Sequence, residues 1–355
     1  MASDEPSGPG DEHFPAGPTR SVGHGEESIR RPRSRYNHPV ELSIVLVNHN
    51  GAACLPQTLE ALARNTVEQD VECLVVDSGS DDDSWQRVEE VWEKARALRF
   101  DRNIGFCAGC NRGAEAATGR LLAFVNFDAA VEPDWDEPLR KLLDDPGVSV
   151  ATGLLLSPDG ATLEAAGLEI APNMATIARL QGRPRDEAPR EPTDVTAASG
   201  ALMMVRRDEF LTLGGFYEGF FMYGEEADYC LRVTGRVVLE PATAVRHEQG
   251  TASGPLRSPF RLYWHSRNRL LNAARQLPLP TALTSVLASA AFDLVTLGQT
   301  RNLPAARAIG RGWRDGLRAM PSERSSRGKC DRKVAAGKLF PFRRALAEQR
   351  RLGRI

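Results

Sequence analysis

Three short apolar runs, each ending in polar side chains, constrain the fold of this chain most strongly. Their sequences are ELSIVLVNHN (41–50), VECLVVDSGSDDDS (71–84) and LLAFVNFDAAVEPDW (121–135). Short apolar runs bounded by turn residues are typical of buried strands. Each run is followed by side-chain oxygens that can bind a ligand, on Asn48 and Asn50, on Asp77, and on Asn126 and Asp128.

Helical patterns follow the first two runs, at 55–63 and 85–98. Strands that alternate with helices predict an α/β fold with a mainly parallel sheet. Ligands bind such sheets at the carboxyl ends of the strands, so we expect the three polar strand ends to meet in one crevice. The dinucleotide-binding fingerprint G-x-G-x-x-G does not follow the first strand, and the P-loop pattern G-x-x-x-x-G-K-[ST] does not occur in the chain. A nucleotide would therefore be bound by a different kind of motif.

Charge is unevenly distributed along the chain. Residues 301–355 contain 16 Lys and Arg against 4 Asp and Glu, a net charge of +12, whereas the whole chain carries −2. A basic arm on an acidic body indicates an anionic partner, either a membrane surface or nucleic acid. The alternative is a charge run that is simply solvated.

The six cysteines show no spacing typical of a disulfide framework, and we find no signal-peptide pattern before them. We therefore expect a reducing, cytoplasmic compartment. Cys107 and Cys110 form a C-x-x-C pair, which without a second pair is weak evidence for a metal or redox site.

Three carboxylates follow an aromatic run in FFMYGEEADYCLR (220–232): Glu225, Glu226 and Asp228. Mutual repulsion and a low local dielectric both raise the pKa of a carboxyl group, which suits a general base that works near neutral pH. Acidic residues are also favoured at a helix N-terminus, and both interpretations can hold together.

The motifs and their order resemble family 2 of the inverting glycosyltransferases, and most of all its rhamnosyltransferase-like branch. Besides the segments above, the resemblance rests on RNIGFCAGCNRG, SGALMMVRRDEF, LGGF and VRHEQGTASG, and it runs from about residue 41 to residue 275. It implies a GT-A fold, a Rossmann-like α/β domain over 39–275 whose donor half precedes its acceptor half.

For the donor, the resemblance implies a nucleotide sugar held by several motifs. The nucleotide would lie against Val47, Asn48 and Asn50, and its base would be hydrogen-bonded by Asp77. The ribose and diphosphate would be surrounded by Arg102, Asn103, Gly105, Phe106 and Asn111.

Asn126-Phe127-Asp128 occupies the position of the D-x-D motif of the family. The resemblance implies that Asp128 binds Mg²⁺ or Mn²⁺ bridging the two donor phosphates, and that Asn126 contributes a neutral oxygen at most. It also implies that His247 is a further ligand, which Mn²⁺ tolerates better than Mg²⁺ does.

The family has Glu-Asp where this chain has Glu225-Glu226, so by position Glu226 is the catalytic base and Glu225 is the alternative. Asp228 and Arg232 would orient the acceptor loop. In the implied reaction, Glu226 deprotonates an acceptor hydroxyl, which attacks the anomeric carbon opposite the diphosphate and inverts its configuration. The metal stabilises the leaving group.

The acceptor implied by the resemblance is a cell-surface glycan or a lipid-linked precursor at the inner face of the plasma membrane, with no nucleic acid partner. Two other classes are possible. A catalytically inactive module that binds nucleotide sugars would explain the departures at Asn126 and Glu226. A nucleotidyltransferase would normally carry a Gly-rich loop with a basic residue after the first strand, and VNHNGAACLP has none.

Four regions are expected along the chain. Residues 1–38 are poor in large apolar side chains and are predicted to be disordered. The domain at 39–275 precedes a helical extension at 276–320 and a basic tail at 321–355. The extension contains PLPTALTSVLASAAFDLVTLG, an apolar helical pattern interrupted by Asp293, which should either lie at a membrane interface or pack on the domain. In the first case, anionic headgroups would be contacted by Arg307, Arg311, Arg314 and Arg318.

Overall fold

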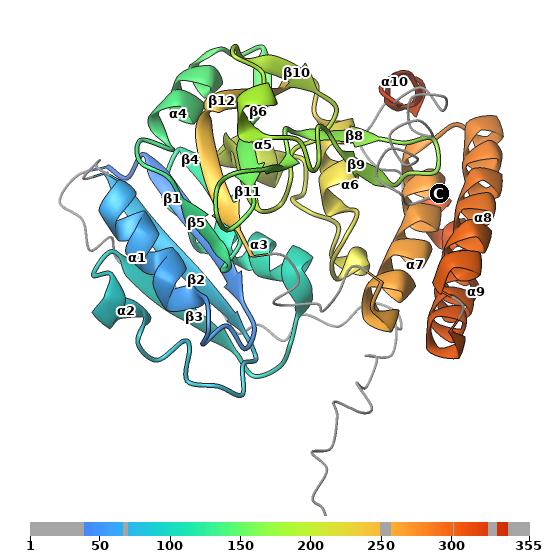
Figure 1. The fold of residues 1–355 in the computed structure, drawn as a ribbon, viewed down its shortest axis with the longest axis horizontal. Helices are drawn as coiled ribbons and strands as arrows, with labels where there is room; N and C mark the ends of the chain where they lie inside the picture. Colours follow the sequence, from blue (N-terminus) through green and yellow to red (C-terminus); the bar gives the residue numbers. More distant parts are fainter. Residues whose placement is uncertain (1–38, 67–69, 249–256, 301, 326–331, 340–355) are drawn as a thin grey trace, which may run out of the picture. The chain divides into compact units, whose positions relative to one another are not determined.

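A computed structural model describes residues 39–66, 70–248, 257–300, 302–325 and 332–339 (Figure 1). The predicted disordered segment 1–38 and most of the basic tail at 321–355 lie outside the described residues.

The first half of the chain forms a parallel sheet whose strands are connected by helices (Figure 1). Its elements are β1 (Leu42–Asn48), α1 (Leu55–Asn65), β2 (Val71–Ser78), α2 (Val88–Val91), β3 (Ala95–Phe100), α3 (Gly105–Ala116) and β4 (Leu121–Val125). β1 lies between β2 and β4, β3 is the edge strand beside β2, and all three pairings are parallel. The three predicted strands, their burial and the α/β fold class are thereby confirmed.

The predicted helix over 85–98 is wrong. The structure has only the four-residue helix α2 there, followed by the strand β3, which pairs with β2 from Cys73 to Ser78. In ARALRF the arginines are three positions apart, so the segment lacks the strict alternation by which a half-buried strand is recognised. Hydrogen bonds with the edge of β2 stabilise an extended strand at 95–100. The pattern of residues 85–98 alone does not predict these hydrogen bonds.

The second half of the chain extends the same sheet. Its elements are β5 (Ala129–Val131), α4 (Glu137–Asp144), β6 (Val148–Leu156), β7 (Leu163–Ala165), η1 (Arg185–Glu187), β10 (Thr193–Val195), β11 (Leu202–Arg206), α5 (Arg207–Thr212), η2 (Glu218–Phe220), α6 (Glu225–Arg232) and β12 (Arg236–His247). Within the described residues the sheet has ten strands, eight of them in the order β10-β12-β6-β11-β4-β1-β2-β3, while β5 pairs with β12 and β7 with β6. β11 is antiparallel to both of its neighbours, whereas β12 is parallel to β6.

The segment at about 155–195 is dense in Pro and Arg, and from this content we expect an irregular structure. The structure is more ordered than this expectation. It contains a separate hairpin, in which β8 (Leu168–Ile170) pairs antiparallel with β9 (Thr176–Ala178). The strands are only three residues long, and strands of this length carry too little periodicity to be recognised in the sequence. The hairpin reaches towards the C-terminal helices (Figure 1).

Helix α3 packs unusually close to β1 because of two glycines one turn apart. A Cβ atom on Gly109 would lie 2.7 Å from Val47 Cγ1, and one on Gly113 would lie 2.3 Å from Val45 Cγ1. Both separations are far below van der Waals contact. The close approach places the N-terminus of α3 next to the carboxyl end of β1.

An aromatic cluster fixes α6 against the sheet. Five pairings of aromatic rings have centroids 4.9–5.6 Å apart, and they involve Phe124 of β4, Phe210 of α5, Phe216 of the segment before η2 and Tyr229 of α6. Aromatic pairs at this separation add to the free energy gained from burial alone. The cluster holds α6, which carries the predicted base, against β4, the strand that precedes the predicted metal ligand Asp128.

In the described part of the chain that follows the sheet, the helices are α7 (Pro259–Gln276), α8 (Leu279–Thr300), α9 (Leu303–Ser325) and α10 (Arg332–Gly337). α9 packs closely on α7 through small residues, since a Cβ on Gly312 would lie 2.6 Å from the Tyr263 carbonyl oxygen. Asp293, the charge inside the apolar pattern of α8, is buried and accepts hydrogen bonds from Arg269 Nη2 (2.5 Å) and Trp313 Nε1 (2.7 Å). The predicted helical extension is therefore tied to α7 and α9.

Candidate functional site

The ends of β1 and β2 are joined by side-chain hydrogen bonds. Asn48 Nδ2 lies 2.9 Å from Asp77 Oδ1, 3.2 Å from Ser80 Oγ and 2.8 Å from Ser84 Oγ. Ser80 also donates to Asp77 through its hydroxyl (2.5 Å) and its backbone N–H (3.2 Å). Asn50, at φ 55°, accepts from the backbone N–H of Asp81 (2.9 Å). The structure thus brings Asn48, Asn50 and Asp77 together, as the sequence predicts.

The same contacts change the interpretation of Asp77. Its side chain is fully buried and its carboxylate is engaged by Asn48 and Ser80, so in this conformation it is occupied by protein partners. Its predicted hydrogen bond to a nucleotide base stays a prediction. Val47, beside it, is 9% exposed.

The RNIGF segment forms the start of α3. Asn103 Oδ1 accepts from the backbone N–H of Gly105 (2.9 Å) and from the Ser78 hydroxyl (3.1 Å), which anchors the helix start to the end of β2. Gly105 has φ 82°, and a Cβ there would lie 2.5 Å from the Phe221 ring. Arg102 is exposed and Phe106 is partly exposed, so both side chains are accessible at this edge.

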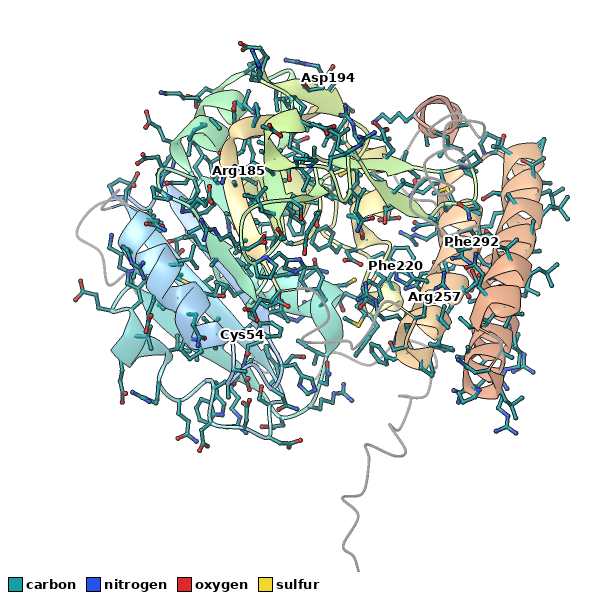
Figure 2. The ribbon with its side chains drawn as sticks, in the orientation of Figure 1. Cys54, Arg185, Asp194, Phe220, Arg257 and Phe292 are labelled. Carbon is teal, nitrogen blue, oxygen red and sulfur yellow. The ribbon has the colours of Figure 1, made fainter. Side chains whose placement is uncertain are left out.

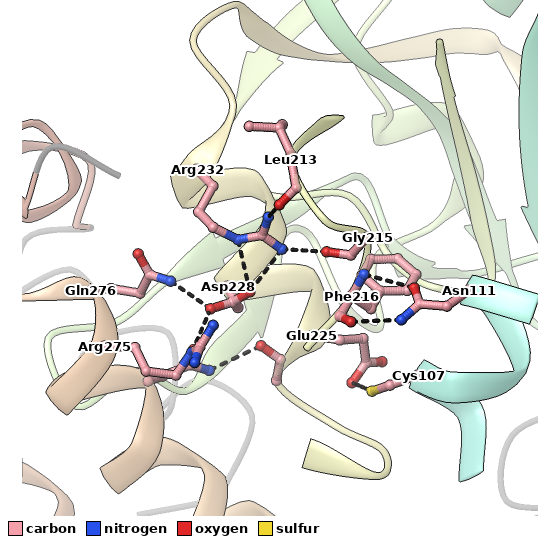
Figure 3. A network of polar contacts seen from close by, with 12 residues as sticks. Cys107, Asn111, Leu213, Gly215, Phe216, Glu225, Asp228, Arg232, Arg275 and Gln276 are labelled. Carbon is pink, nitrogen blue, oxygen red and sulfur yellow. Dashed lines mark hydrogen bonds and ion pairs between the residues drawn. The ribbon is translucent and has the colours of Figure 1, made fainter. Parts of the chain in front are cut away.

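Asn111 of α3 is engaged by the segment that precedes η2. Its side-chain amide exchanges two hydrogen bonds with the backbone of Phe216, at 2.8 and 2.9 Å, and it is 8% exposed (Figure 3). Its contacts in this structure hold the turn before η2, and a contact with the donor stays a prediction.

The predicted metal ligands meet because β5 pairs with β12. In this antiparallel pairing His247 is opposite Ala129, directly after Asp128. His247 Nε2 lies 3.3 Å from Asp128 Oδ1 and 3.3 Å from Asn126 Nδ2. The backbone N–H of Glu248 donates to the Asp128 carbonyl (3.0 Å), which fixes the register. Two residues 119 positions apart are thus placed side by side by backbone hydrogen bonds.

Glu164 of β7 completes this cluster, and the sequence did not indicate it. Its Oε2 lies 3.0 Å from His247 Nδ1, on the side of the ring opposite Asp128. Burial disfavours a charged imidazole, but the Asp128 and Glu164 carboxylates outweigh it and raise the pKa of His247 to about 9. Among the described residues no group of three or more His, Cys, Asp or Glu side chains is arranged to hold a metal by itself.

The two candidate bases lie at the start of α6, after Gly224 at φ 93°. Glu225 is 5% exposed and lies 3.7 Å from Cys107 Sγ, whereas Glu226 is partly exposed and accepts from the Gly224 N–H (3.0 Å). Burial raises the pKa of Glu225 well above its usual range, and the Glu226 charge raises it further. Burial also raises the pKa of Glu226, while a hydrogen bond from Thr176 of β9 opposes the rise. Glu225 and Glu226 thus lie at a helix N-terminus and also have raised pKa values, so both interpretations of the acidic cluster apply.

Asp228 and Arg232 form a buried network rather than an open surface (Figure 3). Asp228 is fully buried and bonds to Arg232 (2.9 Å), Arg275 (3.2 Å) and Gln276 (2.5 Å). Arg232 also donates to the carbonyls of Leu213 and Gly215. Burial favours the neutral acid, but the two arginines outweigh it and lower the pKa of Asp228. The pair ties α6 to α7 and to the Gly214-Gly215 turn, so any influence on the acceptor would be indirect.

Cys107 and Cys110 are both free, buried and on α3. Burial raises the pKa of both thiols well above the ordinary value, as expected for cysteines used in packing.

Two site residues were missed because their segment carries no motif. Glu164 and Thr176 lie in the 155–195 segment and reach the site only through the β6–β7 pairing and the β8–β9 hairpin. Ser80 and Ser84 belong to the polar loop DSGSDDDS, whose composition alone does not distinguish them from its other polar residues.

The fold resembles the GT-A class that is found in glycosyltransferases. Staphylococcus aureus TarS 1–349 superimposes with a TM-score of 0.54 at 15% identity, over 88% of this chain and 92% of that chain. GalNAc-T7 with UDP, GalNAc and Mn²⁺ also has a TM-score of 0.54, at 19% identity, over 68% of this chain and 49% of that chain. At these identities the likeness concerns the fold.

Sequence comparison points to one family. Residues 43–213 match the model of Glycosyl transferase family 2. The O-antigen biosynthesis protein RfbC of Myxococcus xanthus is 26% identical over 253 residues, which are 65% of this chain and 19% of that protein. The glucosyl-dolichyl phosphate glucuronosyltransferase of Haloferax volcanii is 26% identical over 205 residues, 54% of this chain and 63% of that protein. The chain thus spans less than two thirds of the length of either relative.

Proposed function

We propose that this protein transfers a sugar from a nucleotide-diphosphate donor to a cell-surface glycan or lipid-linked acceptor, with inversion at the anomeric carbon and with Mg²⁺ or Mn²⁺ as cofactor. The observation that supports this best is the placement of His247 Nε2 3.3 Å from Asp128 Oδ1 at the carboxyl edge of the sheet. The relative named for O-antigen biosynthesis supports a surface polysaccharide as the product. Rhamnose is the first candidate sugar, because the motifs resemble the rhamnosyltransferase-like branch.

The donor set fits a divalent cation that arrives with a diphosphate. Mg²⁺ is commonly held by one or two carboxylates together with substrate phosphates, so a site with few protein ligands is sufficient. Asp128 would hold the cation through its carboxylate and His247 through Nε2, with Nδ1–H donating to Glu164. A bound cation supplies Lewis-acid stabilisation of the leaving diphosphate.

Glu226 would accept the proton of the acceptor hydroxyl. Its partial exposure and raised pKa suit a base that meets a substrate near neutral pH, whereas Glu225 is buried against Cys107. Glu225 is the alternative base. Asp228 and Arg232 would act by holding α6 in place.

A screen of nucleotide sugars with full-length protein and Mn²⁺ tests the proposal, with dTDP-rhamnose first and released nucleoside diphosphate as the readout. We expect turnover of one donor, lost on treatment with EDTA. Binding of UDP or dTDP without turnover of any donor would favour an inactive binding module. Release of pyrophosphate from a nucleoside triphosphate and a sugar phosphate would favour a nucleotidyltransferase.

We also propose that α8 and α9 contact the inner face of the plasma membrane. The burial pattern of α8 is the reverse of that of an ordinary soluble helix. Its buried residues are polar or small: Ala282, Ser285, Ser289, Asp293 and Thr296. Its leucines face outwards, with Leu287 71% and Leu294 68% exposed, and side chains project from the outer side of the helix (Figure 2). By length and hydropathy α8 could cross a membrane, but its ties to α7 favour lying on the surface.

Exposed arginines on α9 carry a positive charge, which is opposite to the charge of an anionic bilayer. Arg307, Arg314 and Arg318 are exposed on this helix, and each basic side chain near such a surface contributes about 1 kcal/mol. We expect the full-length protein to bind vesicles of mixed phosphatidylserine and phosphatidylcholine, and to bind less as salt increases.

Leu287→Glu with Leu294→Glu should abolish vesicle binding without changing nucleotide binding. Removal of residues 301–355 should weaken vesicle binding through the lost net charge of +12. Pure phosphatidylcholine vesicles are the control. A protein that ignores anionic vesicles at low salt, or a truncation that only lowers the melting temperature, would favour helices that merely pack on the domain.

A further inference from the structure

The loop that leads into the candidate bases has a strained backbone. Phe221 has φ 65° and ψ −59°, and the Met222 N–H donates to the Phe220 carbonyl (2.8 Å). These values describe the rare form of the γ-turn, with positive φ at its centre. Tyr223 also has a positive φ, 66°, and Gly224 has 93°. Non-glycine residues keep such conformations only where the surrounding structure imposes them, and they concentrate at active sites.

One side chain of α7 contacts this loop at three points. Asn268 Nδ2 lies 3.0 Å from the Phe220 carbonyl oxygen, 2.9 Å from that of Met222 and 2.8 Å from that of Tyr223. Asn268 is 1% exposed, so its own amide group is shielded from water. Phe220 lies beside α7 in Figure 2. A single buried amide group thus gathers the carbonyls of three of the four residues at 220–223.

The orientation of this amide is itself fixed. Arg267 Nη1 donates to Asn268 Oδ1 (2.7 Å) and to the Gly219 carbonyl (2.8 Å), so the Asn268 NH₂ group must face the loop. One turn further along α7, Asn272 Nδ2 donates to the Gly224 carbonyl (2.9 Å). Stacking of Phe221 on Trp264, with centroids 4.9 Å apart, adds an apolar contact between the same helix and the loop.

We propose that Asn268 is a positioning residue for the catalytic base, which acts by holding the strained 220–224 loop so that Glu225 and Glu226 face the substrate. The proposal rests on the proposed function of these carboxylates. Asn268 touches neither carboxylate, and its effect is transmitted through the backbone that precedes them. Loss of its amide removes the hydrogen bonds that these carbonyls accept from α7 and lets the γ-turn relax, so the base moves while the strand-end residues stay in place.

Asn268→Ala in the full-length protein tests this. We expect kcat for the donor with the highest turnover to fall by about 10- to 100-fold, since a displacement of about 1 Å at a reacting group costs this much. The dissociation constant for UDP with Mn²⁺ should stay within about twofold of wild type. Hydrogen exchange should accelerate in peptides covering 219–226 and not in peptides covering β1 or β4. Asn272→Ala, which removes one bond, should show the same pattern more weakly and serves if Asn268→Ala does not fold.

Asp293→Asn is the matched control, because it breaks a buried contact of α7 with α8 that does not touch the loop. It should lower the melting temperature while kcat stays within about twofold. Unchanged kcat in Asn268→Ala, or an equal loss of kcat in Asp293→Asn at the same melting temperature, would overturn the proposal. Unchanged exchange at 219–226 would overturn it as well. The exchange measurement needs no substrate, so it separates failure of this proposal from failure of the proposed function.

Discussion

The metal-side cluster of Asp128, His247 and Glu164 and the base loop at 220–226 are held in different ways. Backbone hydrogen bonds between β5, β12 and their neighbours in the sheet set the first, so its side chains are positioned as soon as the strands pair. Side-chain amides of α7 hold the second, against a strained backbone that would relax without them. The comparison indicates that substitutions on the metal side should affect chemistry without disturbing the fold. Substitutions on the base side should affect both.

The largest effect tests the metal side. Asp128→Ala should reduce turnover to background, because it removes the carboxylate that we propose holds the cation together with His247. The melting temperature should change little, since the pairing of β5 with β12 uses backbone atoms. Released nucleoside diphosphate and thermal unfolding measure the two effects. Asp208→Ala, at an exposed carboxylate on α5, is the control, and near wild-type activity in EDTA would refute the metal assignment.

The next effect tests the base side. Glu226→Gln keeps the shape of the side chain and removes the proton acceptor, so kcat should fall by about 10²- to 10⁴-fold with little change in nucleotide affinity. Because the base acts as a carboxylate and its pKa is raised, wild-type kcat should be lost as pH falls, with a midpoint above the usual range for glutamate. A larger loss in Glu225→Gln would exchange the two roles.

A smaller effect sharpens the metal side. Glu164→Gln removes the carboxylate on His247 Nδ1, and we expect Mn²⁺ affinity to fall by about 10- to 100-fold, as is usual when such a supporting group is lost. Titration of Mn²⁺ with UDP present measures affinity, and ¹⁵N shifts of His247 report the tautomer. Glu132→Gln is a matched control, because Glu132 is held by Arg185 and Arg246 and does not contact His247. Equal Mn²⁺ affinities in all three proteins would contradict the supporting role.

The smallest effect concerns stability at the base side. The pKa of Glu225 is raised on folding, so its contribution to stability is complete below its unfolded pKa of about 4.3 and is lost as pH rises towards the folded value. Glu225→Gln has no such loss. Its melting temperature should therefore exceed that of wild type by a few degrees at pH 8 and match it near pH 4. Glu60→Gln, at an exposed site on α1, should show no pH-dependent difference.

The sequence by itself determined the strands at 42–47 and 121–125, the class of the fold and the motif residues at the strand ends. These follow from runs of apolar residues that end in polar ones, and such patterns are local. The local pattern wrongly predicts one helix over 85–98, because hydrogen bonds with the edge of β2 stabilise an extended strand in that segment.

Only the tertiary structure decided which partners these residues have. Asp128 and Glu164 meet His247 from segments 119 and 83 positions away in the chain, and Asn268 reaches the base loop from a helix that the family match at 43–213 does not include. The outward leucines of α8 follow from Asp293 and Ser289 facing other elements of the protein. Strand pairing and helix docking bring together groups with no relation in local sequence, because their energies arise from contacts that exist only after the chain has folded.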